Sequence, residues 1–119
     1  MARRNEPDAV PFTLVAFLGP VPVGCVSVCR DDRDADFDAE GPWLSGMFVL
    51  GSARDLGVGR ALVRAAEERA AAMGHRELWL HTAEAHRFYE RCGWRVARVR
   101  SALGRDAVMC RELAAPGSG

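Results

Sequence analysis

Apolar and polar residues alternate in short runs through the first half of the chain, and clusters of glycine and proline separate these runs. Alternation of this kind predicts β-strands, because successive side chains of a strand point to opposite faces. We expect the first two strands to form a hairpin, since Gly19-Pro20-Val21-Pro22 favours a turn between them. The three expected strands cover Thr13–Leu18, Val23–Arg30 and Trp43–Leu50.

The pattern changes to helical spacing after Trp43–Leu50. From about Gly57 to Met73 the apolar positions recur every three to four residues, and Gly74 is expected to end this helix. This helix is predicted from the apolar residues Val58, Leu62, Ala65, Ala66 and Met73. The remaining elements are a strand over Glu77–Thr82, a short helix over Glu84–Cys92, and strands over Trp94–Val99 and Asp106–Leu113.

The resulting order, β-β-β-α-β-α-β-β, predicts an α/β (α+β) domain with a mixed, mostly antiparallel sheet. The strands Trp43–Leu50 and Glu77–Thr82 are joined by a helix, so we expect them to be parallel. At 119 residues the chain is expected to be a single domain, 1–119, with a loose arm over 1–11 and a frayed tail over 114–119.

Composition narrows the class of function. The formal net charge of zero argues against a nucleic-acid partner, and no apolar run reaches the roughly 20 residues of a membrane span. The N-terminus lacks the pattern of a signal peptide, and the four cysteines lack the paired spacing of a zinc site. We therefore expect a cytoplasmic protein with reduced thiols and no metal. The absence of lysine, isoleucine and glutamine, with abundant arginine and alanine, suggests a GC-rich bacterial genome.

The turn Arg54-Asp55-Leu56-Gly57-Val58-Gly59-Arg60 stands between an expected strand and the long helix. The first N–H groups of a helix have no internal acceptor, and the helix dipole is positive there. Without a Cβ atom at Gly57 and Gly59, an anion such as a phosphate can approach these N–H groups. The spacing fits neither a Walker loop nor the dinucleotide-binding fingerprint. A tight strand-to-helix turn without a ligand is the alternative.

The segment from Met47 to Val96 resembles the GNAT superfamily of acetyl-CoA-dependent N-acetyltransferases. The family's loop pattern, Arg/Gln-x-x-Gly-x-Gly/Ala, corresponds to Arg54–Gly59, and its Phe-Tyr-Glu-x-x-Gly-Phe-like segment corresponds to Phe88–Trp94. The resemblance weakens before Trp43. The family's first strand and the one or two helices that wall its acceptor site have no counterpart here, so that wall is expected to be missing, shortened or supplied by another subunit.

The resemblance implies a GNAT-like sheet in which the central parallel strands splay apart, with a bulge at Gly46 where the splay begins. It implies that acetyl-CoA binds as co-substrate, with its pantetheine arm along the strand before the loop. Its pyrophosphate would accept hydrogen bonds from backbone N–H groups of about Asp55 to Arg60. The residues assigned to this binding are Met47, Phe48, Val49, Arg54, Asp55, Leu56, Gly57, Val58, Gly59 and Arg60.

The resemblance also assigns catalytic roles. Tyr89 matches the family's general acid, which protonates the departing thiolate, although the apolar stripe around it, taken without the resemblance, favours a core tyrosine. His81 matches the position of the base in some members, and its alternative is a strand-end histidine bonded to backbone. Glu84 or a water relay could replace His81. A backbone N–H near Phe48 or Val49 could stabilise the oxyanion.

The acidic loop Asp31–Glu40 imitates the spacing of a calcium loop, but the required central glycine and the closing glutamate are absent. We expect a solvated hairpin tip, or a charge that attracts a cationic amine. Three functions are thus in view. They are an acetyltransferase for a small-molecule or peptide amine, an inactive coenzyme A-binding or regulatory module, and a subunit that works only as a homodimer.

Overall fold

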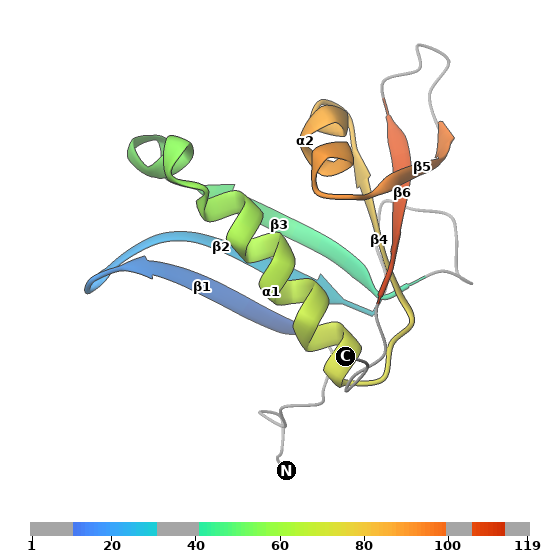
Figure 1. Cartoon of the computed structure of the whole chain (residues 1–119), viewed down its shortest axis with the longest axis horizontal. Coiled ribbons are helices and arrows are strands. Elements are labelled where there is room, and N and C mark those ends of the chain that lie inside the picture. Colours follow the sequence, from blue (N-terminus) through green and yellow to red (C-terminus); the bar gives the residue numbers. More distant parts are fainter. Residues whose placement is uncertain (1–10, 31–40, 100–105, 114–119) are drawn as a thin grey trace.

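In the computed structural model, which describes residues 11–30, 41–99 and 106–113, six strands form one sheet in the order β1-β2-β3-β4-β6-β5 (Figure 1). The predicted order of elements and the mixed sheet are confirmed. The expected N-terminal arm (apart from Pro11), the acidic loop and the tail lie outside the described residues. The elements are β1 (Phe12–Leu18), β2 (Val21–Cys29), β3 (Trp43–Val49), η1 (Gly51–Leu56), α1 (Val58–Ala72), β4 (Glu77–Thr82), α2 (His86–Arg91), β5 (Arg95–Val99) and β6 (Ala107–Glu112).

The parallel pair β3–β4 divides the sheet into two antiparallel halves. These strands are in register at one residue pair, Trp43 and Trp79, and the N–H of Trp79 donates to the carbonyl of Pro42 at 3.0 Å. Beyond this point β3 and β4 diverge, so the sheet opens toward the end where α2 lies (Figure 1). The predicted parallel pair and its splay are confirmed.

A bulge at Gly46 bends β3 where the strands part. Between the paired positions Cys25–Phe48 and Ser27–Ser45, β3 holds one residue more than β2. Gly46 takes a φ of 66°, which a residue with a side chain adopts only under strain. The predicted bulge is therefore confirmed, and it lies immediately before the segment Met47–Val49.

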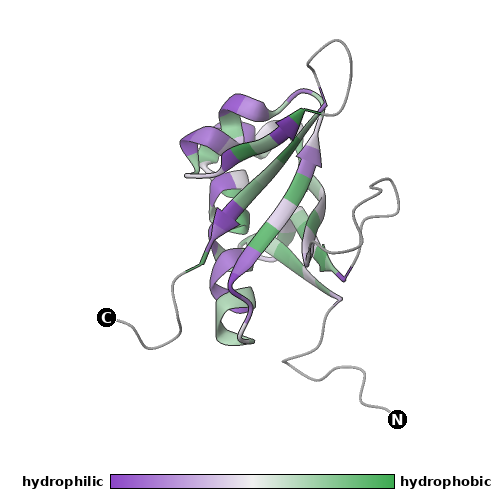
Figure 2. Cartoon of the chain, turned by 90° about the vertical axis from the view of Figure 1, so that its right-hand side faces the viewer, coloured by the Kyte–Doolittle hydropathy of each residue, from purple (hydrophilic) through white to green (hydrophobic). Residues whose placement is uncertain are grey.

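Both helices contribute to the main hydrophobic core on one face of the sheet. Buried side chains of α1, among them Leu62 and Ala66, pack with Tyr89 of α2 and with Leu78 and Leu80 of β4. Trp79 lies between Leu78 and Leu80 and so points to the opposite face. There it forms a second buried cluster with Trp43, Val108 and Cys110. Figure 2 shows hydrophobic and hydrophilic bands along the strands of the sheet.

Several boundaries differ from the sequence-based expectation. The turn of the hairpin takes only Gly19 and Pro20, so β2 begins at Val21. The segment before Gly57 forms a 3-10 helix, η1, which no periodic pattern had indicated. Ala65, expected on the apolar face of α1, is exposed, and Val63 is buried in its place.

The short helix is also narrower than expected, since α2 covers only His86–Arg91. No helix of the described segments is long and apolar enough to cross a membrane.

Candidate functional site

A cavity of about 320 Å³ lies beside the end of β3, where the chain passes through η1 into α1. The end of β3 and the beginning of α1 both contribute to its lining. Six of its lining residues had been assigned to coenzyme binding from the sequence, and one had not. The lining residues are Met47, Phe48, Val49, Arg54, Gly59, Arg60 and, beyond expectation, Phe88.

The first turn of α1 presents unused backbone donors at this cavity. Gly57 is the N-cap residue with a left-handed φ of 78°, and no side chain caps the helix. The first backbone bond runs from the N–H of Ala61 to the carbonyl of Gly57 at 3.0 Å. The N–H groups of Val58, Gly59 and Arg60 therefore have no acceptor within the helix. Together with the positive end of the helix dipole, they favour an anion.

The approach to these donors is open at Gly57, because the position of a Cβ atom there faces open space with nothing within 4 Å. The first turn of α1 also contains no acidic residue that would repel an anion. Arg54 and Arg60 line the cavity and add positive charge. The donor set and the open approach fit a pyrophosphate.

The remaining residues of the predicted loop contribute less to the cavity than Arg54, Gly59 and Arg60 do. Asp55 and Leu56 are exposed and do not line the cavity, and Leu56 is 61% exposed. The side chain of Val58 belongs to the hydrophobic core, so only its backbone can serve a ligand. These positions shape the turn more than they contact the cavity.

Phe88 closes the cavity from the side of α2. A Cβ atom built on Gly59 would lie 3.3 Å from Cζ of Phe88, which is tighter than ordinary van der Waals contact. The glycine at position 59 thus lets α1 and α2 approach each other. Phe88 stood in the recognised Phe-Tyr-Glu segment, but its position in the cavity follows from helix packing that sequence spacing does not reveal.

The backbone of β3 offers a donor toward the gap between the splayed strands. The N–H of Leu50 donates to the carbonyl of Val23 at 2.8 Å, on the β2 side. Because successive backbone groups of a strand alternate in direction, the N–H of Val49 points toward the β4 side. Of the two positions considered from the sequence, Val49 rather than Phe48 is thus directed into the gap.

Tyr89 lies behind Phe88 and is not a lining residue of the cavity. Its ring meets Phe88 edge-on with centroids 5.0 Å apart, and it lies 5.9 Å from the ring of Trp94. The side chain is 7% exposed, and this burial raises the pKa of the Tyr89 phenol to about 12. The phenol is therefore protonated at neutral pH and can donate a proton.

His81 lies near the end of β4 on the face that carries Trp79, and it does not line the cavity. Its Nε2 atom is 3.9 Å from Oδ1 of Asp106, and both side chains are partly exposed. Glu84 is exposed in the loop before α2. Within the part of the chain that the structure describes, no group of three histidine, cysteine or acidic side chains could hold a metal.

Comparison with known proteins points to one family. Residues 2–94 match the model of the acetyltransferase (GNAT) family. The search of curated protein sequences returned no significant match.

Solved structures of acetyltransferases share the fold. An aminoglycoside 6'-N-acetyltransferase complexed with coenzyme A has a TM-score of 0.71 and 18% identity, over 91% of this chain and 76% of that one. The aminoglycoside 6'-N-acetyltransferase from Enterococcus faecium has a TM-score of 0.72 and 17% identity, over 96% of this chain and 78% of that one. The IAA acetyltransferase from Bacillus cereus ATCC 14579 has a TM-score of 0.68 and 20% identity, over 87% of this chain and 78% of that one.

Proposed function

The chain belongs to the acetyltransferase (GNAT) family, and we propose that it binds acetyl-CoA in the cavity beside β3 and acetylates a primary amine of a small molecule or peptide. One observation carries this proposal. The parallel strands β3 and β4 pair only at Trp43 and Trp79, and they diverge beside a cavity whose lining includes an uncapped helix start. A splayed pair leaves backbone groups that an extended, amide-rich ligand can satisfy.

The residues of the cavity divide into two groups by chemistry. The N–H groups of Val58, Gly59 and Arg60, with the Arg54 and Arg60 guanidiniums, would hold the pyrophosphate of the coenzyme. Met47, Phe48 and Val49 would line the path of the pantetheine arm. Asp55, Leu56 and Gly57 would form the turn that presents these donors. Bound acetyl-CoA supplies an acetyl thioester, which is the activated acyl group of the reaction.

The chain's own groups would then serve the transfer. The N–H of Val49 would donate to the thioester carbonyl oxygen as negative charge develops there. Tyr89, whose phenol is protonated at neutral pH, would donate its proton to the departing thiolate. His81, whose Nε2 atom is 3.9 Å from Oδ1 of Asp106, would take the proton of the attacking ammonium. Glu84 is the reserve base.

We place this activity in a single domain, because the six described strands make one sheet. None of the four cysteines, all of which lie in the described residues, forms a disulfide bond, which suits the reducing conditions of the cytoplasm.

We also propose a homodimer formed through β1. This strand is an edge of the described sheet, it carries no charged residue, and Val15 and Phe17 on it are about half exposed. Natural edge strands usually carry charges that prevent pairing with another chain. Sedimentation at high concentration should give twice the monomer mass, and a monomer throughout would contradict the dimer.

An acceptor screen tests the proposed activity. Acetyl-CoA would be offered with polyamines, amino acids, aminoglycosides and peptides with free N-termini, and amine-dependent release of the coenzyme thiol would be recorded. At least one class should raise the release rate well above the amine-free rate and yield an acetylated amine. Measured acetyl-CoA binding without turnover on any amine would favour a coenzyme-binding module instead.

A further inference from the structure

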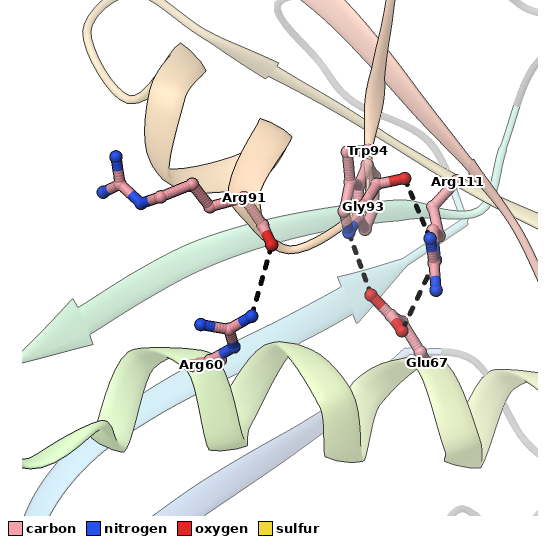
Figure 3. Close-up of polar contacts among 6 residues, drawn as sticks. All are labelled: Arg60, Glu67, Arg91, Gly93, Trp94 and Arg111. Atoms are coloured by element: carbon pink, nitrogen blue, oxygen red, sulfur yellow. Dashed lines mark hydrogen bonds and ion pairs between the residues drawn. The ribbon is translucent and has the colours of Figure 1, made fainter.

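A polar cluster joins α1 to the corner where α2 turns into β5, and the catalytic proposal makes no use of it (Figure 3). Glu67, in the middle of α1, accepts a hydrogen bond from Nε1 of Trp94 at 2.9 Å. The other carboxylate oxygen of Glu67 is 3.7 Å from Nε of Arg111 on β6. Arg111 in turn donates from Nη1 to the carbonyl of Gly93 at 2.8 Å. The corner is thus held from both a helix and a strand.

The corner depends on glycine for this contact. Gly93 has a φ of 100°, and a Cβ atom there would overlap the guanidinium of Arg111. Further toward the start of α1, Nη2 of Arg60 donates to the carbonyl of Arg91 at 3.3 Å. The contacts from α1 therefore reach the end of α2 and the corner that follows it (Figure 3).

The held corner is directly coupled to Tyr89. The backbone N–H of Trp94 donates to the carbonyl of Tyr89 at 2.9 Å, and the two rings pack at 5.9 Å. A displacement of Trp94 would therefore move both the backbone and the ring of Tyr89. The indole N–H of Trp94 donates to Glu67, so Glu67 contributes to the position of Trp94.

Burying the carboxylate of Glu67 costs desolvation free energy, which an apolar side chain that only packed at this position would not cost. The side chain of Glu67 is only 15% exposed, and burial is the largest influence on its pKa, which is raised. Replacing a whole buried ion pair by apolar residues is often neutral or stabilising, whereas removing one partner leaves the other uncompensated. The retained carboxylate makes directional contacts that an apolar side chain would not provide.

From these contacts we propose that Glu67 is a positioning residue for the acetyl transfer, which fixes Trp94 and Arg111 so that the Tyr89 phenol is held in its reactive place. This inference rests on the proposed role of Tyr89 as general acid. A misplacement of about 1 Å in a catalytic group can cost on the order of 100-fold in rate. Loss of the Glu67 contacts should therefore lower turnover without weakening the binding of acetyl-CoA.

The test is a double-mutant cycle with Glu67→Leu and Tyr89→Phe, with kcat for an amine found in the screen and calorimetric Kd for acetyl-CoA as readouts. Glu67→Leu should lower kcat by roughly 10- to 100-fold in the protein that has Tyr89. In the Tyr89→Phe background the same change should cost less than about threefold, because the group it positions is already absent. The Kd should stay unchanged in all variants.

Matched variants separate positioning from general damage. Glu68 is the exposed neighbour of Glu67 on α1, so Glu68→Leu should leave kcat unchanged. Glu67→Gln keeps an oxygen acceptor for the indole N–H and should retain most of the turnover. If Glu67→Leu fails to fold, Trp94→Phe removes the donor from the other side and should show the same dependence on Tyr89.

The possible failures are distinguishable. An equal loss of kcat in both backgrounds, or no loss in either, would overturn the positioning role of Glu67 while leaving Tyr89 as the acid. Full turnover in Tyr89→Phe alone would overturn the acid role and with it the inference built on it.

Discussion

Gly59 on α1 and Phe88 on α2 touch so closely that a Cβ atom at position 59 would lie 3.3 Å from Cζ of the phenyl ring. Both residues line the cavity beside β3. The second glycine of the loop thus sets the distance between the two helices as well as exposing a backbone donor. The shape of the cavity depends on this contact.

Replacing Gly59 by valine should therefore distort the cavity. The added carbons would meet Phe88 and Val49, and overpacking of this kind costs about 1–3 kcal/mol of stability. We expect the affinity for acetyl-CoA, measured by calorimetry, to fall at least about tenfold, which corresponds to roughly 1.4 kcal/mol. Ala65→Val at an exposed position of the same helix is the control and should bind normally. Unchanged affinity in a folded Gly59→Val protein would remove Gly59 from the site.

Tyr89 is the only tyrosine of the chain, so the ultraviolet absorbance of phenolate reports on it alone. Burial raises its pKa from 10.0 to about 12 in the folded protein. The stability that belongs to the protonated phenol is then fully present below about pH 10 and is lost as the pH rises through about 12. We expect titration near 12 in the folded protein and near 10 after unfolding. Titration near 10 in the folded state would show that the phenol is solvated.

His81 should govern the acidic side of the rate profile. A base accepts the ammonium proton only in its neutral form, so turnover should rise with pH as His81 loses its proton. In His81→Ala this limb should disappear, and the rate at neutral pH should fall by about 10²–10⁴-fold. The pH dependence of kcat/KM checks both expectations. A profile that keeps the same limb in His81→Ala would assign the proton transfer to Glu84 or to water.

The fold could be predicted from local signals in the sequence, and most of the residues around the cavity were indicated by the resemblance to the GNAT family. Alternation gave the strands, and the glycine pattern gave the start of α1. The residues Met47–Val49, Arg54 and Arg60, which the resemblance assigned to coenzyme binding, all line the cavity, and their binding role stays a prediction. A 3-10 helix has no periodic signature, so η1 was missed.

What the sequence could not provide depends on packing between elements distant along the chain. Phe88 enters the cavity because Gly59 lets α2 come close. Glu67 stands in a charged stretch of α1 that looks solvent-exposed, yet it accepts the indole N–H of Trp94, 27 residues away. The orientation of Tyr89 behind Phe88 likewise follows from this tertiary arrangement, and its role as acid stays a prediction.

The buried carboxyl group of Glu67 should also make the free energy of unfolding depend on pH. Burial raises its pKa above the ordinary value of 4.5. The stability that the protonated Glu67 carboxyl contributes is therefore fully present below about pH 4.5. It is lost as the pH rises through the raised pKa of Glu67 in the folded protein. Urea unfolding across this window should show a decline in the free energy of unfolding that is absent in Glu67→Gln. An identical decline in both proteins would mean that Glu67 is effectively solvated.

The central claim is that the start of α1 binds acetyl-CoA, and Gly57 and Gly74 offer a matched comparison at the two ends of this helix. Both have positive φ, 78° and 95°, and a Cβ atom at either would meet nothing within 4 Å. Gly57→Ala and Gly74→Ala should thus carry similar backbone strain, about 1–2 kcal/mol. Calorimetric titration with acetyl-CoA should show an affinity at least about tenfold lower for Gly57→Ala, because strain at the N-cap disturbs the first N–H groups. Gly74→Ala should bind as the wild type does. Equal affinities of the two folded variants would contradict the claim.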